Sequence, residues 1–162
     1  RFPVDSLITR FKHQSRWPYG RLLAELLAEH LQHAFDHGLP RPDCLLPVPL
    51  AKQRLRQRGF NQAGMLANWL GASLELPVEH NCLLRLRDTQ AQQQLDAAER
   101  KRNLRQAFSL SESAQIKDRH FAIVDDVLTT GATANTLARL LSKAGARRVD
   151  IYCLARTPRP GD

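Results

Sequence analysis

The sequence has few cysteines and no long apolar run. Its three cysteines, Cys44, Cys82 and Cys153, lie far apart and form no CxxC pair. This excludes a zinc ribbon or a disulfide framework built within the chain, and it makes a reducing cytoplasm the expected location. No apolar run approaches the roughly 20 residues that a membrane-spanning helix needs, and residues 1–12 lack the apolar core of a signal peptide. We therefore expect a cytoplasmic protein without a membrane span.

What the sequence does contain is typical of one globular domain with a basic surface. Its 162 residues are 43% hydrophobic and 25% charged, and the formal net charge is +8. A chain of this length buries about 70% of its unfolded surface, which is enough for a core. The positive charge favours a polyanionic partner such as nucleic acid, an anionic membrane or a phosphorylated small molecule, although it also serves solubility. The first residue is Arg1 rather than Met, as expected of a piece of a longer protein.

Hydrophobic spacing predicts alternating helices and strands. Residues 20–37 carry leucines at three- and four-residue steps, which is typical of an amphipathic helix. A strand at 121–124, a helix at 135–144 ending at Gly145, and a strand at 149–155 form a right-handed βαβ unit, so we expect a parallel sheet. The other predicted elements are a strand at 44–48, a helix at 61–70 capped by Asn61, one or two strands in 74–87, a loop at 88–99 and a short basic helix at 97–106.

The most informative segment follows the strand at 121–124. Asp125 and Asp126 are predicted to stand at the carboxyl end of that strand, which is where open α/β sheets bind ligands. Residues 129–133, Thr-Thr-Gly-Ala-Thr, come just before a helix, whose free N–H groups and dipole favour an anion. A helix cap and a solvated acidic pair would each be ordinary features alone. In this order they predict a site where one ribose 5-phosphate-type ligand places its phosphate on 129–133 and its hydroxyls on the two carboxylates.

This segment resembles the phosphoribosyl pyrophosphate (PRPP) motif of type I phosphoribosyltransferases, and other blocks resemble the ComF family in particular. Residues 47–50 (PVPL), Arg54 and residues 58–62 (RGFNQ) are similar to one ComF block. Residues 83–108 are similar to the next block, and the resemblance covers nearly the whole chain. The residues that carry this second block are Arg85, Arg87, Thr89, Gln94, Arg100 and Asn103.

The resemblance implies a fold and a domain plan. The fold would be α/β and type I phosphoribosyltransferase-like, with an open, mostly parallel sheet flanked by helices and a small hood. Residues 1–20 would form the hood or entry segment, and residues 21–158 the phosphoribosyltransferase-like domain. ComF proteins usually carry an N-terminal cysteine-rich zinc-binding segment, which we expect to be absent from this chain.

The resemblance also implies a role for each block. The loop after the strand at 44–48 would hold pyrophosphate, and 85–103 would be the flexible loop that closes over PRPP. The implied PRPP phosphate and ribose site comprises Asp125, Asp126, Val127, Leu128, Thr129, Thr130, Gly131, Ala132 and Thr133. The implied pyrophosphate site comprises Pro49, Leu50, Ala51, Lys52, Arg54 and Arg100. The implied catalytic residues are Asp125, Asp126, Arg85 and Arg87. Mg²⁺ would act as cofactor, held through PRPP near the two aspartates rather than by direct protein ligands.

Three functions stay open at this point. The first is a glycosyltransferase that transfers phosphoribose from PRPP to an unidentified acceptor, in a protein linked to DNA uptake and transformation. The second is a non-catalytic PRPP- or phosphate-binding module that handles single-stranded DNA, with competence-machinery proteins as further partners. The third is a regulator that senses PRPP. Catalysis by departure of pyrophosphate would need leaving-group stabilisation and exclusion of water more than a protein nucleophile.

Overall fold

A three-stranded parallel sheet forms the centre of the computed structural model, which describes residues 17–86, 96–128 and 131–156. The strands are β1 (Cys44–Pro47), β4 (His120–Leu128) and β5 (Arg148–Arg156), in the order β1-β4-β5. β1 pairs with β4 from Cys44↔Phe121 to Pro47↔Val124, and β4 pairs with β5 from His120↔Arg148 to Leu128↔Arg156. All three carboxyl ends therefore lie at one edge of the sheet.

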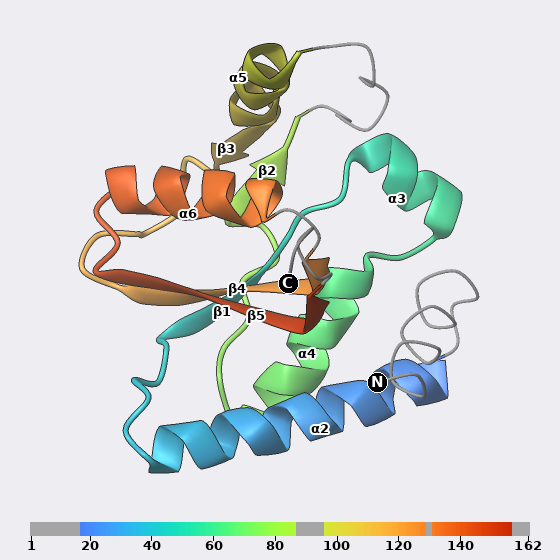
Figure 1. The fold of residues 1–162 in the computed structure, drawn as a ribbon, viewed down its shortest axis with the longest axis vertical. Helices are drawn as coiled ribbons and strands as arrows, with labels where there is room; N and C mark the ends of the chain where they lie inside the picture. Colours follow the sequence, from blue (N-terminus) through green and yellow to red (C-terminus); the bar gives the residue numbers. More distant parts are fainter. Residues whose placement is uncertain (1–16, 87–95, 129–130, 157–162) are drawn as a thin grey trace.

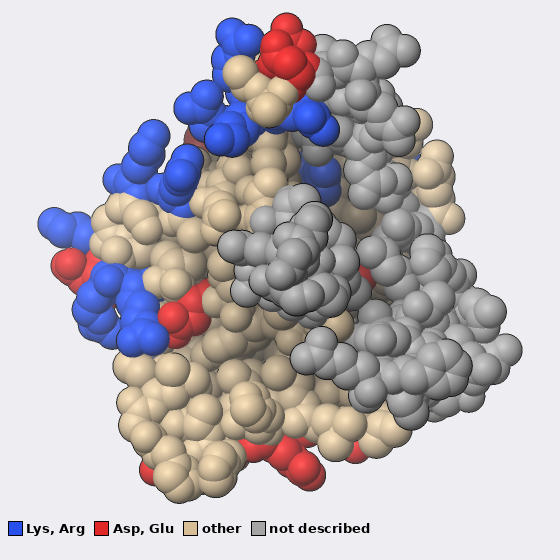
Figure 2. Space-filling model, in the orientation of Figure 1, with Lys and Arg blue, Asp and Glu red and all other residues tan. Residues whose placement is uncertain are grey.

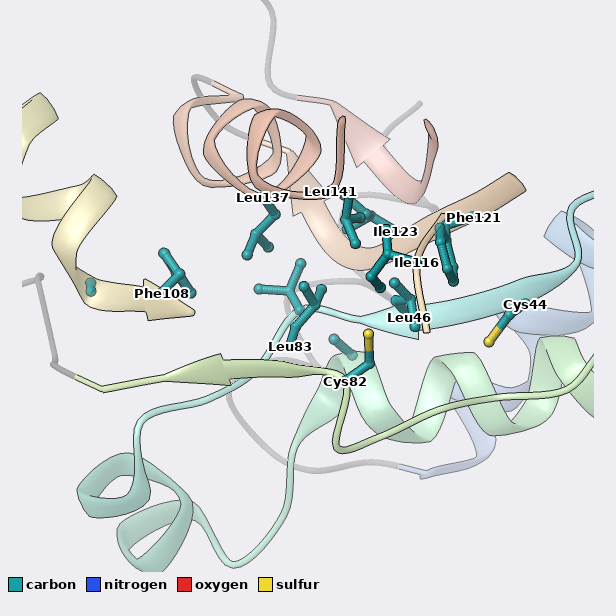
Figure 3. Packing of buried hydrophobic residues seen from close by; sticks show 13 residues of the cluster. Cys44, Leu46, Cys82, Leu83, Phe108, Ile116, Phe121, Ile123, Leu137 and Leu141 are labelled. Atoms are coloured by element: carbon teal, nitrogen blue, oxygen red, sulfur yellow. The ribbon is translucent and has the colours of Figure 1, made fainter. Parts of the chain in front are cut away.

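Helices cover both faces of this sheet (Figure 1). α6 (Ala132–Lys143) packs on one face, and α2 (Trp17–Asp36) and α4 (Gln62–Leu74) pack on the other. The alternation of β4 divides the core accordingly. Phe121 and Ile123 join one buried cluster, whereas Ala122 and Val124 join the other. Figure 3 shows Leu137 and Leu141 pointing from α6 into the buried cluster, with Leu141 beside Ile123.

A smaller unit projects beyond α6. β2 (Leu83–Arg85) and β3 (Phe108–Leu110) form an antiparallel ribbon, and α5 (Ala97–Ala107) leads directly into β3. Figure 1 places this unit at one end of the molecule, with α3 (Lys52–Arg58) at its side. α5 begins at the N-cap Asp96, whose carboxylate accepts a hydrogen bond from the Glu99 N–H at 2.8 Å.

The predicted α/β architecture, with a parallel sheet flanked by helices, and the βαβ unit are confirmed. α6 ends as predicted, since Gly145 takes a left-handed φ of 102° and Ala146 N–H donates to Leu141 O at 3.1 Å. The predicted end of the strand at Val124 is wrong, because β5 continues to pair with β4 as far as Leu128. The strands predicted within 74–87 include β2. β3 was not predicted, because its three residues carry no periodic signal of their own.

Two of the predicted segments lie largely or partly outside the described residues. Residues 1–16 of the predicted hood are among them, while 17–20 form the first turn of α2. Residues 87–95 of the predicted flexible loop are also outside the described part of the chain.

None of the helices in the described ranges combines the length and apolar character required to cross a bilayer.

Two glycines of α4 are expected to respond in opposite ways to alanine. A Cβ on Gly71 would lie 2.6 Å from Val78 Cγ2 and 2.8 Å from Leu76 O, so the chain following the helix would have to move. A Cβ on Gly64 would meet nothing nearer than 3.5 Å, and this helical site gains from alanine. We expect Gly71→Ala to lower the free energy of unfolding by about 1–3 kcal/mol and Gly64→Ala to raise it by about 0.4–1 kcal/mol. Urea denaturation of both variants checks this, and equal responses would contradict the described packing of α4.

Candidate functional site

Three chain segments meet at the carboxyl edge of the sheet. β1 ends beside β4, and Val48 N–H donates to Val124 O at 2.9 Å, so the turn at 49–51 starts next to Asp125. Beyond Val124, β5 is the only strand of the described residues that pairs with β4. α6 then begins at Ala132, shortly after β4 ends at Leu128. The edge therefore brings together the turn after β1, the acidic pair and the start of α6.

Asp125 and Asp126 are half-buried residues within β4. The Asp125 carboxylate accepts a hydrogen bond from the Asp126 N–H through Oδ1 at 2.8 Å, which orients that carboxylate. The pairing with β5 runs to Asp125↔Cys153 and resumes at Val127↔Ala155. The strand thus holds two acidic side chains in a fixed place where β1 no longer covers its edge.

The start of α6 has the geometry of an anion site. Gly131 is the N-cap with φ 79° and ψ 2°, and its carbonyl accepts the first helical hydrogen bond from Asn135 N–H at 2.8 Å. A glycine N-cap has no side-chain oxygen to accept from the first-turn N–H groups. Thr133 is half-buried in that first turn. Backbone donors and the positive end of the helix dipole therefore lie at the sheet edge that carries the acidic pair.

Asn61 fixes the turn that follows β1. Its Nδ2 donates to Val48 O at 3.1 Å, while its Oδ1 accepts from Ala63 N–H at 3.1 Å and caps α4. Gly59 ends α3 with φ 79°, as expected of a chain reversal. The structural role predicted for Asn61 is confirmed, and its bond to Val48 is a contact that sequence reasoning missed. No local sequence signal points to a carbonyl 13 residues away.

The predicted pyrophosphate and catalytic residues fall in three places. Pro49, Leu50 and Ala51 lie in the turn at the sheet edge, with Pro49 and Leu50 half-buried and Ala51 buried. Arg85 lies on β2 with its guanidinium 5.2 Å from the centroid of the Phe108 ring, and Arg100 is exposed on α5, so both belong to the projecting unit. Arg87, Thr129 and Thr130, and the side chains of Lys52, Arg54 and Val127, lie outside the described residues. The described residues thus unite the turn, the acidic pair and the start of α6, and they leave the two arginines on a separate unit.

Exposed cations gather on a different side of the molecule. Figure 2 shows blue side chains over α5, α6 and the start of β5, which we call the basic face. Its residues are Arg100, Lys101, Arg102, Arg105, Arg139, Lys143, Arg147 and Arg148, all exposed. The sequence analysis did not single out the last four. The available signals were the i, i+4 spacing of Arg139 and Lys143 and the Arg-Arg pair that opens β5.

The fold and the edge geometry define a class, the type I phosphoribosyltransferases. The phosphoribosyl transferase domain family matches residues 57–161. Among solved structures, the chain is similar to a purine phosphoribosyltransferase from Pyrococcus horikoshii, with a TM-score of 0.55, 21% identity, and coverage of 90% of this chain and 78% of that one. It is also similar to a Trypanosoma cruzi hypoxanthine phosphoribosyl transferase, with a TM-score of 0.55, 16% identity, and coverage of 86% and 74%. At these identities the likeness concerns the fold.

Closer relatives identify the branch of this class. The chain is 40% identical over 156 residues to competence protein F of Haemophilus influenzae, covering 95% of this chain and 68% of the relative. It is 39% identical over 156 residues to the DNA utilization protein YhgH of Escherichia coli K12, covering 96% and 68%. It is 34% identical over 170 residues to competence protein ComFC of Bacillus subtilis, covering 94% and 67%. The chain belongs to the ComF family of phosphoribosyltransferase-domain proteins.

Proposed function

We propose that this chain binds PRPP at the carboxyl edge of its sheet and acts as a phosphoribosyltransferase-family protein in DNA uptake. The observation that carries the proposal is the joint position of the turn after β1, the acidic pair and the glycine-capped start of α6. The match to the phosphoribosyl transferase domain supports the ligand, and the names of the relatives, competence protein F and DNA utilization protein, support the process.

Each segment has a role in this proposal. The 5-phosphate lies on residues 129–133 at the start of α6, and the ribose hydroxyls bind Asp125 and Asp126. The pyrophosphate lies on the turn at 49–51, with Lys52 and Arg54 next along the chain. Arg85, Arg87 and Arg100 are proposed to stabilise the departing pyrophosphate. Because Arg85 and Arg100 belong to the β2–α5–β3 unit, this role requires that unit to approach the edge when PRPP is bound.

The two carboxylates also fit the cation that normally accompanies PRPP. Mg²⁺ prefers oxygen ligands and usually takes one or two carboxylates plus phosphate oxygens. Within residues 17–86, 96–128 and 131–156, no three His, Cys, Asp or Glu side chains gather as a metal site. The proposed Mg²⁺ would therefore take most of its oxygens from PRPP, with Asp125 and Asp126 beside it, and would neutralise charge on the pyrophosphate.

Two measurements test binding and catalysis separately. Titration calorimetry with PRPP and Mg²⁺ is expected to show one site per chain, and no heat of binding would remove the proposal. Release of pyrophosphate when nucleobases are added would show transfer to an acceptor. Binding without release across such a panel would support the sensor or binding module over the transferase.

The basic face supports a second candidate function, the handling of single-stranded DNA. Eight exposed cations on three elements form a surface suited to a phosphate backbone. This face includes the start of β5, whereas the proposed PRPP site lies at the carboxyl ends of the strands. Apart from Arg100, which is also proposed to contact the departing pyrophosphate, the two sites share no residue, so we expect PRPP and single-stranded DNA to bind the same chain together.

We expect affinity for single-stranded DNA to fall steeply with salt and to depend on the basic face. Arg139→Gln/Lys143→Gln removes two cations from α6 and should lower the slope of log K against log salt by about 1.4, since each phosphate contact on a single strand contributes about 0.7. The matched control Arg21→Gln/Arg56→Gln removes two exposed cations elsewhere and should leave the slope unchanged. Fluorescence anisotropy over a salt series makes the comparison. Equal slopes for the two variants would show that α6 does not contact DNA.

A further inference from the structure

A cavity of about 480 Å³ opens at the amino edge of the sheet, at the opposite end of β1 and β4 from the acidic pair. Its wall comes from residues 78–82, Ser111, residues 113–115 and Arg119. Arg119 immediately precedes β4, and Val78 pairs with Leu45 of β1. None of the described residues of the proposed PRPP site lines this cavity.

Hydrogen bonds hold the wall in place. Glu79 N–H donates to Leu45 O at 3.1 Å, which fastens Glu79 beside β1. Ser111 N–H donates to Cys82 O at 2.9 Å and joins the second wall segment to the first. The wall is thus made of loop segments that hydrogen bonds tie to β1 and to one another.

Arg119 and Glu79 form the charged part of this wall. Arg119 Nη2 lies 3.2 Å from Glu79 Oε1, its Nη1 donates to Gln115 O at 2.8 Å, and its guanidinium lies 4.9 Å from the centroid of the Phe121 ring. These contacts orient the guanidinium but use only part of its five N–H donors. The two side chains keep 29% and 39% of their surface exposed, so both are accessible from the cavity.

The rest of the lining combines hydroxyl, amide, thiol and imidazole groups with the apolar side chains of Val78 and Ala114. Ser111 and Ser113 contribute hydroxyls that lie 3.1 Å apart, and Asn81 and Gln115 contribute amides. Burial, reinforced by the Glu79 carboxylate, raises the pKa of the Cys82 thiol to about 11, so this lining thiol stays neutral. Among the described residues, the lining offers no Phe, Tyr or Trp on which a nucleobase would stack.

The geometry points to a binding site for the zwitterionic group of a free α-amino acid or short peptide, with its carboxylate on Arg119 and its ammonium on Glu79. A phosphate or other pure anion fits less well, because the Glu79 carboxylate stands beside the guanidinium and repels it. The volume leaves room for a side chain against the hydroxyls and amides. This inference does not depend on PRPP binding.

The test uses titration calorimetry of the chain with each of the 20 standard amino acids and with a set of dipeptides. We expect at least one ligand with a Kd of about 1 mM or tighter. Its N-acetylated and its amidated forms should each bind about tenfold more weakly or worse, because each has lost one of the two charges. No binding in either set, or equal binding of the blocked forms, would overturn the inference. If only dipeptides bind, the site takes a short zwitterionic peptide, through both of its charged ends, rather than a free amino acid.

Variants locate the site and separate it from the PRPP site. Arg119→Gln and Glu79→Gln should each weaken binding about tenfold or more, whereas Arg139→Gln, which removes an exposed cation outside the cavity, should not. Thermal melting shows whether each variant is folded. If Arg119→Gln does not fold, Arg119→Lys, which retains the positive charge, takes its place. Asp126→Asn should lose PRPP binding and keep amino-acid binding. Amino-acid binding that survives in both Arg119→Gln and Glu79→Gln would place the ligand elsewhere.

Discussion

PRPP with Mg²⁺ at about one hundred times its Kd is expected to raise the midpoint of thermal unfolding by about 5–10 °C. Binding to the folded chain alone adds about 2.7 kcal/mol at that concentration, and a domain of this size gains about 2–4 °C per kcal/mol. The double variant Asp125→Asn/Asp126→Asn keeps the shape of both side chains but removes the charges proposed to bind ribose hydroxyls and to accompany Mg²⁺. We expect it to lose the shift.

Asp118→Asn is the matched control for this experiment. Asp118 is exposed, precedes β4 at the amino edge and has φ 62°, a conformation that asparagine tolerates well. Its variant should retain the full shift with PRPP. A shift that survives in the double variant would show that the acidic pair does not bind the ligand, and loss in the control would show a nonspecific effect of charge.

Replacement of Gly131 should weaken PRPP binding according to backbone conformation rather than size. A Cβ at Gly131 would meet only Asn135 Nδ2, at 3.8 Å, so space does not limit the position. The backbone conformation limits it instead, because at the left-handed φ of 79° a β-branched residue is strained by about 1–3 kcal/mol. We expect Gly131→Val to weaken PRPP binding by about tenfold or more, since about 1.4 kcal/mol corresponds to a factor of ten.

Gly131→Asn separates conformation from mere substitution. Asparagine adopts a left-handed conformation several-fold more readily than most residues, so this variant should retain most of the affinity. Titration calorimetry of both variants with PRPP makes the comparison. Equal affinity of Gly131→Val and wild type would show that the start of α6 does not contact the phosphate.

The elements with clear periodicity were predictable from the sequence, and those that depend on a distant partner were not. The local spacing of apolar residues predicts the strand at 121–124 and the helix that follows it. The extension of β4 through Asp125 and Asp126 depends on pairing with β5, which no residue within β4 encodes. Likewise, Leu83–Arg85 forms a strand because Phe108–Leu110 lies against it, more than 20 residues along the chain.

The same distinction applies to the candidate site. Asp125, Asp126 and Gly131 stood out because residue types and order within one short segment carry the chemistry. The turn after β1 joins them only through the parallel pairing of β1 with β4, which the βαβ pattern implied in general but not in register. Glu79 and Arg119 are 40 residues apart in the sequence and form their ion pair only in the folded chain, so no local motif could predict it.

A crystal structure of the chain with PRPP and Mg²⁺ tests the central claim most directly. We predict the 5-phosphate within hydrogen-bond distance of the backbone N–H groups at Gly131–Thr133, and the ribose hydroxyls on Asp125 or Asp126. A phosphate bound on the basic face instead, with the carboxyl edge of the sheet contacting no part of the ligand, would contradict the account.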